Sequence, residues 1–174
     1  YFDNSDTYFN PTGNENYYIS QADLNALLEN VSNIDKFYVN VMQRYQWAGS
    51  CYGMSATAIL AKIGVLSPDQ VQSAASDLYH VTKTSHDDAV ESLINFYHLL
   101  QCTTPLQNNK SQFSLQTTAA QLSELEQKAS RVPTGGNPVL LCFGMYGTDK
   151  ADGTYKRLGG HAVVAYGVEY KGDG

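Results

Sequence analysis

A cysteine and a histidine are the residues best suited to chemistry in this sequence, and the cysteine has the more informative surroundings. Cys51 lies within Gln46-Trp47-Ala48-Gly49-Ser50-Cys51-Tyr52-Gly53-Met54-Ser55, where a turn is expected to become a helix. A thiol at the start of a helix faces the positive end of the helix dipole and free backbone N–H groups, and both favour the thiolate. Glycines on either side leave the sulfur accessible, so the pattern predicts a nucleophile.

The histidine follows two glycines, in Gly159-Gly160-His161-Ala162-Val163-Val164, and is expected at the very start of an apolar strand. In a Cys–His pair the imidazole takes the thiol proton and later delivers a proton to the leaving amine. His161 follows Cys51 by 110 residues. Only tertiary folding can bring the two side chains together, so the hypothesis depends on the elements between them.

Helical periodicity and capping residues predict five helices, over residues 20–34, 51–62, 68–79, 85–100 and 118–130. Ser20 and Ser67 are expected N-caps, and Pro68 suits a first helical position. Gly64 is expected to end the helix that Cys51 begins. The small residues of that helix favour burial and a close crossing with its neighbours.

Two buried strands are expected after these helices, at residues 139–143 and 162–170, with a turn over residues 147–153 and a turn signal at Gly159-Gly160. Helices first and strands last predict an α+β fold with segregated halves. We expect one domain over residues 1–174, with an N-terminal arm and helical lobe to about residue 132 and a β lobe from about residue 133.

Composition limits the class of partner. The chain has 174 residues, with 11 Lys and Arg against 17 Asp and Glu, for a net charge of −6. This charge argues against nucleic acid or an anionic membrane as the main partner, and no apolar run is long enough to span a bilayer. Only 16% of residues are charged, which favours a secreted or cell-surface protein. Its polar N-terminus would then belong to a mature or trimmed form.

Three cysteines leave at least one thiol unpaired, which makes a reactive cysteine worth testing. Cys102 and Cys142 are expected as buried thiols, and a disulfide between them would leave Cys51 as the odd one. His80, His86 and His98 lack the spacing of metal ligands, so no metal and no cofactor is expected.

The segment from Gln46 to Ser55, together with Gly160-His161-Ala162-Val163-Val164, resembles the papain-like cysteine peptidases, in particular divergent bacterial members. The resemblance implies a helical lobe that begins its long helix with the nucleophile Cys51, and a β lobe that carries His161 as general base and acid. It also implies that the Gln46 side chain and the Cys51 N–H bind the oxyanion. The expected substrate is a peptide or protein, and no cofactor is needed.

The chain departs from that family in several respects, among them the oxyanion glutamine and the residue that orients the histidine. Gln46 lies five residues before the cysteine, where six is usual, and Gln43 is the substitute. The Asn or Asp that orients the histidine is expected beyond residue 174, so the β lobe is expected to be incomplete. We therefore expect a fragment of a processed enzyme, completed by a C-terminal piece or second chain. A propeptide or protein inhibitor is a further expected partner.

Two other functions stay open at this point. An inert papain-like domain would act as a binding or adhesion module, keeping the cleft without the reactivity. A transglutaminase-like acyltransferase uses the same Cys–His pair, although its spacing is usually much shorter than the one found here.

Overall fold

The computed structural model describes residues 18–44, 49–81, 89–148, 151 and 153–172. Within these ranges the fold is α+β, as expected. The helices are α2 (Gln21–Glu29), α3 (Asn33–Arg44), α4 (Cys51–Lys62), α5 (Pro68–Val71), α6 (Ala89–Leu100), α7 (Thr104–Ser114) and α8 (Thr118–Ala129), with 3₁₀ turns η1 (Leu78–His80) and η2 (Val132–Thr134). The strands are β1 (Val139–Thr148) and β2 (Tyr155–Ala165).

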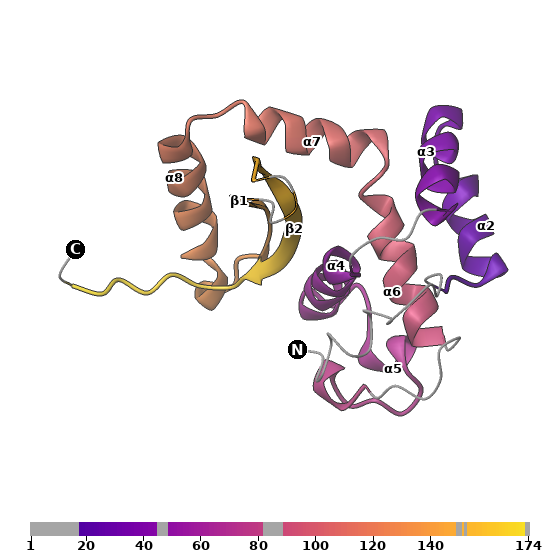
Figure 1. Ribbon diagram of the computed structural model, residues 1–174. Coiled ribbons are helices and arrows are strands. Elements are labelled where there is room, and N and C mark those ends of the chain that lie inside the picture. Colours follow the sequence, from indigo (N-terminus) through magenta and orange to yellow (C-terminus); the bar gives the residue numbers. More distant parts are fainter. Residues whose placement is uncertain (1–17, 45–48, 82–88, 149–150, 152, 173–174) are drawn as a thin grey trace.

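Helix α6 holds the helical part together because it is buried on two faces (Figure 1). Its first half contributes Ile94 to a core shared with α5, η1 and the loop after α4: Leu66, Val71, Leu78, Val81 and Val90. Its last turn contributes Leu99 to a second core, shared with α2 and α3: Leu24, Leu27 and Val39. Ile94 and Leu99 are both fully buried. Two apolar clusters thus meet on one helix.

Strands β1 and β2 form an antiparallel hairpin in which Val139 pairs with Ala165 and Thr148 pairs with Tyr155. The register shifts between Met145 and Tyr146, as a β-bulge does. In Figure 1 the hairpin lies between α8 on one side and α4 on the other, with α7 passing across its end. Helices therefore flank the hairpin on both sides.

A buried polar network fixes the chain directly before Cys51. Asn95, on α6, is fully buried and accepts a hydrogen bond from the Ser50 hydroxyl at 2.7 Å. Its amide nitrogen donates to the carbonyl of Tyr18, also at 2.7 Å. Buried polar groups are costly unless they are paired, so these bonds hold Ser50 and Tyr18 against one helix.

Helices α4 and α6 cross very closely at Gly53. A Cβ atom at this position would lie 2.1 Å from the carbonyl oxygen of Ile94 and 3.0 Å from the Cβ of His98. Only glycine allows the two backbones to approach this far. The close crossing expected from the small residues of this helix is therefore confirmed.

Several predicted helix ends are also confirmed. The Ser20 hydroxyl accepts from the N–H of Asp23 at 3.1 Å, and α4 runs from Cys51 to Lys62. Gly64 follows this helix with a φ of 76°, in the left-handed region that favours glycine. The capping box at Ser67 is present, with its N–H donating to Gln70 Oε1 at 2.8 Å. Helix α8 matches its predicted range within one residue.

The helix predicted over residues 20–34 is wrong, because the structure contains two helices there. Helix α2 ends at Glu29, and α3 begins at Asn33. The Ser32 hydroxyl accepts from the N–H of Asp35 at 3.2 Å, so a second capping serine restarts the helix. Ile34, Phe37 and Tyr38 of α3 have helical spacing, but their side chains are exposed rather than buried.

The helix predicted over residues 68–79 is wrong as well. Helix α5 stops at Val71, Gln72 is extended, and Ala74 has a φ of 67°. Val71 and Leu78 enter the core separately, and the mostly polar residues between them, of which Ala75 packs against the core, offer no continuous apolar face to hold a helix. Helix α7 was missed because it contains few apolar residues, although Thr103 and Pro105 give a start signal.

The strand predictions need three corrections. The segment 139–143 is half-buried to exposed rather than buried, because one hairpin cannot cover both of its faces. The second strand covers Tyr155–Ala165, not residues 162–170, and ends where β1 offers no further partner. Gly159 and Gly160 lie inside β2 instead of forming a turn, which places His161 within the strand and not at its start.

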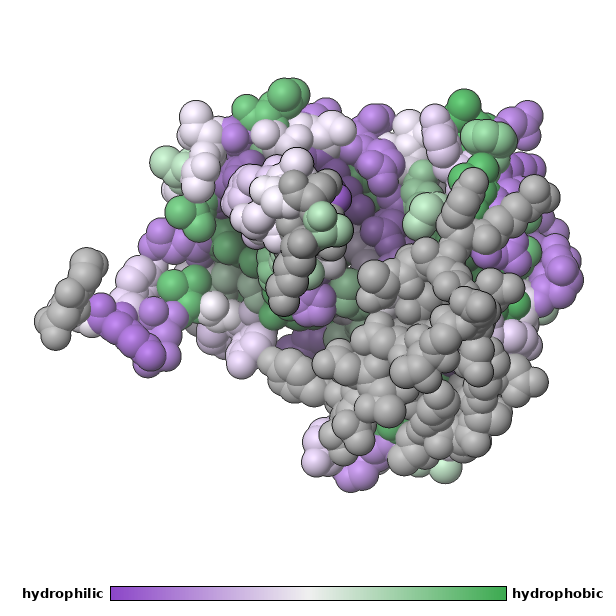
Figure 2. Space-filling model, viewed as in Figure 1, coloured by the Kyte–Doolittle hydropathy of each residue, from purple (hydrophilic) through white to green (hydrophobic). Residues whose placement is uncertain are grey.

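Some predictions fall outside the described residues: the arm before Tyr18, Gln46, Trp47, and the helix start at Ser85 and Asp88. Among the described residues, no helix has both the length and the apolar character needed to cross a membrane. Figure 2 shows polar and apolar side chains interspersed over the face in view, with apolar ones near the hairpin and α8.

We expect Gly53→Ala to lower the free energy of unfolding by about 2–3 kcal/mol, because the added methyl group overpacks the α4–α6 crossing. In an exposed helix the same change would stabilise by about 1 kcal/mol. Urea unfolding of both proteins measures the sign. Gly172→Ala is the control, since no atom lies within 4 Å of its Cβ position. An unchanged or raised stability in Gly53→Ala would contradict the close crossing.

Candidate active site

Cys51 is the first residue of α4, as the sequence predicts, and is partly exposed. The residue before it, Ser50, occupies the N-cap position but does not cap the helix with its side chain. Its hydroxyl is instead bonded to Asn95. Because the first N–H groups of a helix have no partner within it, the start of α4 offers donors beside the sulfur. This arrangement suits a thiolate or an oxyanion.

His161 is exposed on β2, opposite Phe143 of β1. The two rings pack edge to face with their centroids 5.8 Å apart. The next residue, Ala162, is buried, and its carbonyl accepts a hydrogen bond from the Ser55 hydroxyl at 3.1 Å. Ser55 lies one turn after Cys51, so this buried bond ties the helix of the cysteine to the strand of the histidine.

Cys51 and His161 line the same cleft, which has a volume of about 1060 Å³. Its walls come from the start of α4, the end of α6, α7, α8 and the hairpin. Two residues that are 110 positions apart in the sequence therefore lie along the same solvent-accessible cleft. This volume is at the upper end of the range usual for ligand pockets, and it suits a segment of peptide.

All three cysteines are free, so the disulfide between Cys102 and Cys142 is absent. Partial burial raises the pKa of the Cys102 thiol, although the charge of Lys110 opposes the shift. Cys142 was expected to be buried but is exposed as a residue, while desolvation of its thiol still raises its pKa. The charge of Lys110 lowers the pKa of Cys142, and a charge on Cys51 raises it.

Tyr52, directly after the cysteine, is buried and also lines the cleft. Burial raises the pKa of its hydroxyl to about 12, so it stays protonated at neutral pH. The amino group of Lys110 lies 5.0 Å from the centre of its ring, a cation–π contact. This pair fixes a positive charge on the α7 side of the cleft.

A second histidine, His98 of α6, lies beneath the start of α4. It is 5% exposed, and its ring faces the edge of Tyr52 with centroids 6.4 Å apart. Burial lowers its pKa to about 4, with the charge of Lys110 adding to the effect. At neutral pH His98 is therefore an uncharged packing residue. Sequence analysis gave no sign of this position beyond a histidine on a helix.

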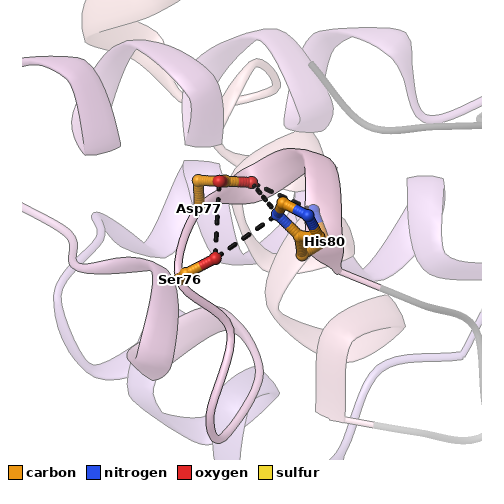
Figure 3. A network of polar contacts seen from close by, with 3 residues as sticks. All are labelled: Ser76, Asp77 and His80. Atoms are coloured by element: carbon orange, nitrogen blue, oxygen red, sulfur yellow. Dashed lines mark hydrogen bonds and ion pairs between the residues drawn. The ribbon is translucent and has the colours of Figure 1, made fainter.

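Ser76, Asp77 and His80 form a contact network that contains the residue types of a catalytic triad (Figure 3). Asp77 Oδ1 lies 2.8 Å from His80 Nδ1, and the Ser76 hydroxyl lies 3.3 Å from that same nitrogen. A proton relay needs both ring nitrogens, one for each partner. Asp77 also accepts from the N–H of His80 at 3.1 Å, so the network caps η1.

The predicted oxyanion residue Gln46 lies outside the described residues. Its substitute Gln43 belongs to α3 and is not among the described residues that line the cleft. No group of three His, Cys, Asp or Glu side chains in the described ranges is arranged to hold a metal ion.

Three further residues line the cleft without having been predicted there from the sequence: Lys110, Cys142 and Arg157. Their places depend on tertiary contacts that no local pattern encodes.

Comparisons of the chain with protein-family models, with curated proteins and with solved structures found no match.

Burial of His98 should make stability depend on pH. The unfolded chain binds a proton near pH 6.5 and the folded protein only near pH 4, so the unfolded state holds more protons between these values. Stability is then fully present above pH 6.5 and falls as the pH drops toward 4. We expect the free energy of unfolding to fall by about 2 kcal/mol between pH 7 and pH 5 from this residue.

Urea unfolding at both pH values measures this loss. His98→Gln should flatten the profile, whereas His80→Gln, a change at an exposed histidine, should leave its slope unaltered. If His98→Gln kept the full slope, another group would be responsible.

Proposed function

We propose that this protein is a cysteine peptidase, with Cys51 as nucleophile and His161 as general base and acid. The observation that carries the proposal is that these two residues, 110 positions apart in the sequence, both belong to the lining of one cleft. The cysteine also begins a helix whose N-cap side chain does not cap it. A cysteine at the start of a helix, served by a histidine, is the arrangement that an activated thiol needs.

The reaction begins when His161 takes the proton of the Cys51 thiol. The sulfur attacks the peptide carbonyl carbon, and an electron pair moves onto the oxygen to form a tetrahedral oxyanion. As the C–N bond breaks, the imidazolium gives its proton to the leaving amine. Water then attacks the thioester, His161 takes a proton from it, and the C–S bond breaks to release the acid and restore the thiol.

The backbone N–H of Cys51 is the donor that we assign to the oxyanion, because the start of α4 offers such groups next to the sulfur. Gln46 is the second donor in this proposal, from the resemblance to the papain-like peptidases. The mechanism requires no cofactor. The papain-like form of the α+β fold, bacterial origin, secretion or surface location, and completion of the β lobe by another segment belong to the same proposal.

We expect Cys51→Ala to lower the rate of hydrolysis by about 10⁴-fold or more, because it removes the nucleophile. Release of fluorescence from a labelled unfolded protein measures the rate. Iodoacetamide at neutral pH should add one group to the native protein and none to this variant. Burial raises the pKa of Cys102 and of Cys142, so their thiols stay protonated and react slowly.

Cys102→Ser is the matched control, because this thiol lies outside the described lining of the cleft. It should keep both hydrolysis and labelling. If the Cys51→Ala protein hydrolysed the substrate at an undiminished rate, the proposed peptidase mechanism would be wrong. An unreactive Cys51 in a protein that still binds peptides would favour the inert binding module. Transfer of the acyl group to an added amine in preference to water would favour the acyltransferase.

A further inference from the structure

The charge of the cleft is opposite to that of the protein. The chain carries 17 acidic and 11 basic residues, yet the described residues that line the cleft include three basic side chains and one carboxylate. That carboxylate, Glu124, is already paired with Lys128 at 2.5 Å. Lys110 and Arg157 are the remaining cations, and neither forms an ion pair with a carboxylate in the described part of the chain.

The guanidinium of Arg157 occupies a space that two glycines create on the hairpin. Gly144 and Gly160 are paired across the hairpin, and Gly160 directly precedes His161. A Cβ atom at Gly160 would lie 2.7 Å from Nη2 of Arg157, and one at Gly144 would lie 3.4 Å from its Nε. The Nε–H donates to the carbonyl of Gly159 at 3.0 Å, which fixes the guanidinium.

Lys110 lies on the α7 wall of the cleft, over the ring of Tyr52. Its amino group donates one hydrogen bond, to Gln101 Oε1 at 3.4 Å. An ammonium group has three donors. The cleft thus contains two cations, the guanidinium over Gly144 and Gly160 and the ammonium over the ring of Tyr52.

We propose that the cleft selects peptides that carry a carboxylate close to the bond held at Cys51, and that Arg157 is the residue that binds this carboxylate. The inference rests on the proposed function for its substrate class. A guanidinium held by one hydrogen bond keeps further N–H groups free for a two-point contact with a carboxylate. Lys110 adds to the positive field of the cleft and draws acidic peptides toward it.

Binding to the Cys51→Ala protein tests the proposal without catalysis. The probes are fluorescent pools of acetylated, amidated decapeptides with a central Glu, Gln or Lys, and anisotropy gives the affinity. The Glu pool should bind about 10- to 100-fold more tightly than the Gln pool, as expected for hydrogen bonds to a charged group. A Gln pool with a free C-terminus shows whether a terminal carboxylate replaces the side chain.

Three variants in the same background identify the residue. Arg157→Gln should remove the preference for Glu, and Arg157→Glu should shift it to the Lys pool. Gly160→Ala keeps the charge but displaces the guanidinium, so it should weaken the preference as well. Arg131→Gln, the same change at an exposed arginine outside this cleft, should leave the preference intact.

Equal affinity for the Glu and Gln pools would overturn the proposal, as would a Glu preference that survives both Arg157→Gln and Gly160→Ala. Neither result depends on hydrolysis, so the failure of this inference is distinct from a failure of the proposed peptidase. If the wild-type protein hydrolysed the three peptide pools at equal rates, and if this hydrolysis depended on Cys51, the proposed peptidase activity would stand. The proposed preference for acidic peptides would then be wrong.

Discussion

The close crossing of α4 and α6 at Gly53 is the constraint on which the position of Cys51 depends. Because the backbone of α4 lies directly against the Ile94 carbonyl, the first turn of that helix cannot slide or rotate without a clash. On the N-terminal side of Cys51, the hydrogen bond from Ser50 to Asn95 fixes the preceding residue to α6. One turn further on, the Ser55 hydroxyl donates a hydrogen bond to the Ala162 carbonyl and so fixes α4 against β2. Three short-range contacts therefore set where the thiol lies relative to the strand of His161, although 110 residues separate the two.

A second pair of glycines acts on the hairpin in the same physical way. Gly144 and Gly160 provide no side-chain bulk, and the guanidinium of Arg157 occupies the space above them. At both places a missing Cβ admits another group to a position it could not otherwise reach: a helix backbone in one case and a cation in the other. These glycines therefore determine which groups reach the cleft. The β-bulge between Met145 and Tyr146 bends β1, the strand that carries Gly144.

Sequence patterns predicted the parts of this structure that depend on local chemistry. The cap at Ser20, the start of α4 at Cys51 and its end before Gly64 follow from neighbouring residues, and so they are confirmed. The break between α2 and α3 was missed because a capping serine competed with a continuous apolar pattern. The position of Gly160 could not be predicted, since a glycine pair signals a turn unless a partner strand is known. Arg157 and Lys110 belong to the candidate site only through tertiary contacts, which no spacing in the chain reveals.

The structure also bears on which histidine can serve the thiol, because His98 and His161 both line the cleft. His98 is nearly buried under Tyr52, and its pKa of about 4 reflects how poorly that site accommodates a charge. A base so unfavourable to protonation cannot hold a thiol proton as an imidazolium, which the proposed attack by sulfur would require. His161 is exposed, and water and substrate can both reach it. Its ring packs edge to face with Phe143. Burial thus makes His98 a neutral support for the helix, whereas the exposed His161 remains the histidine of the proposed mechanism.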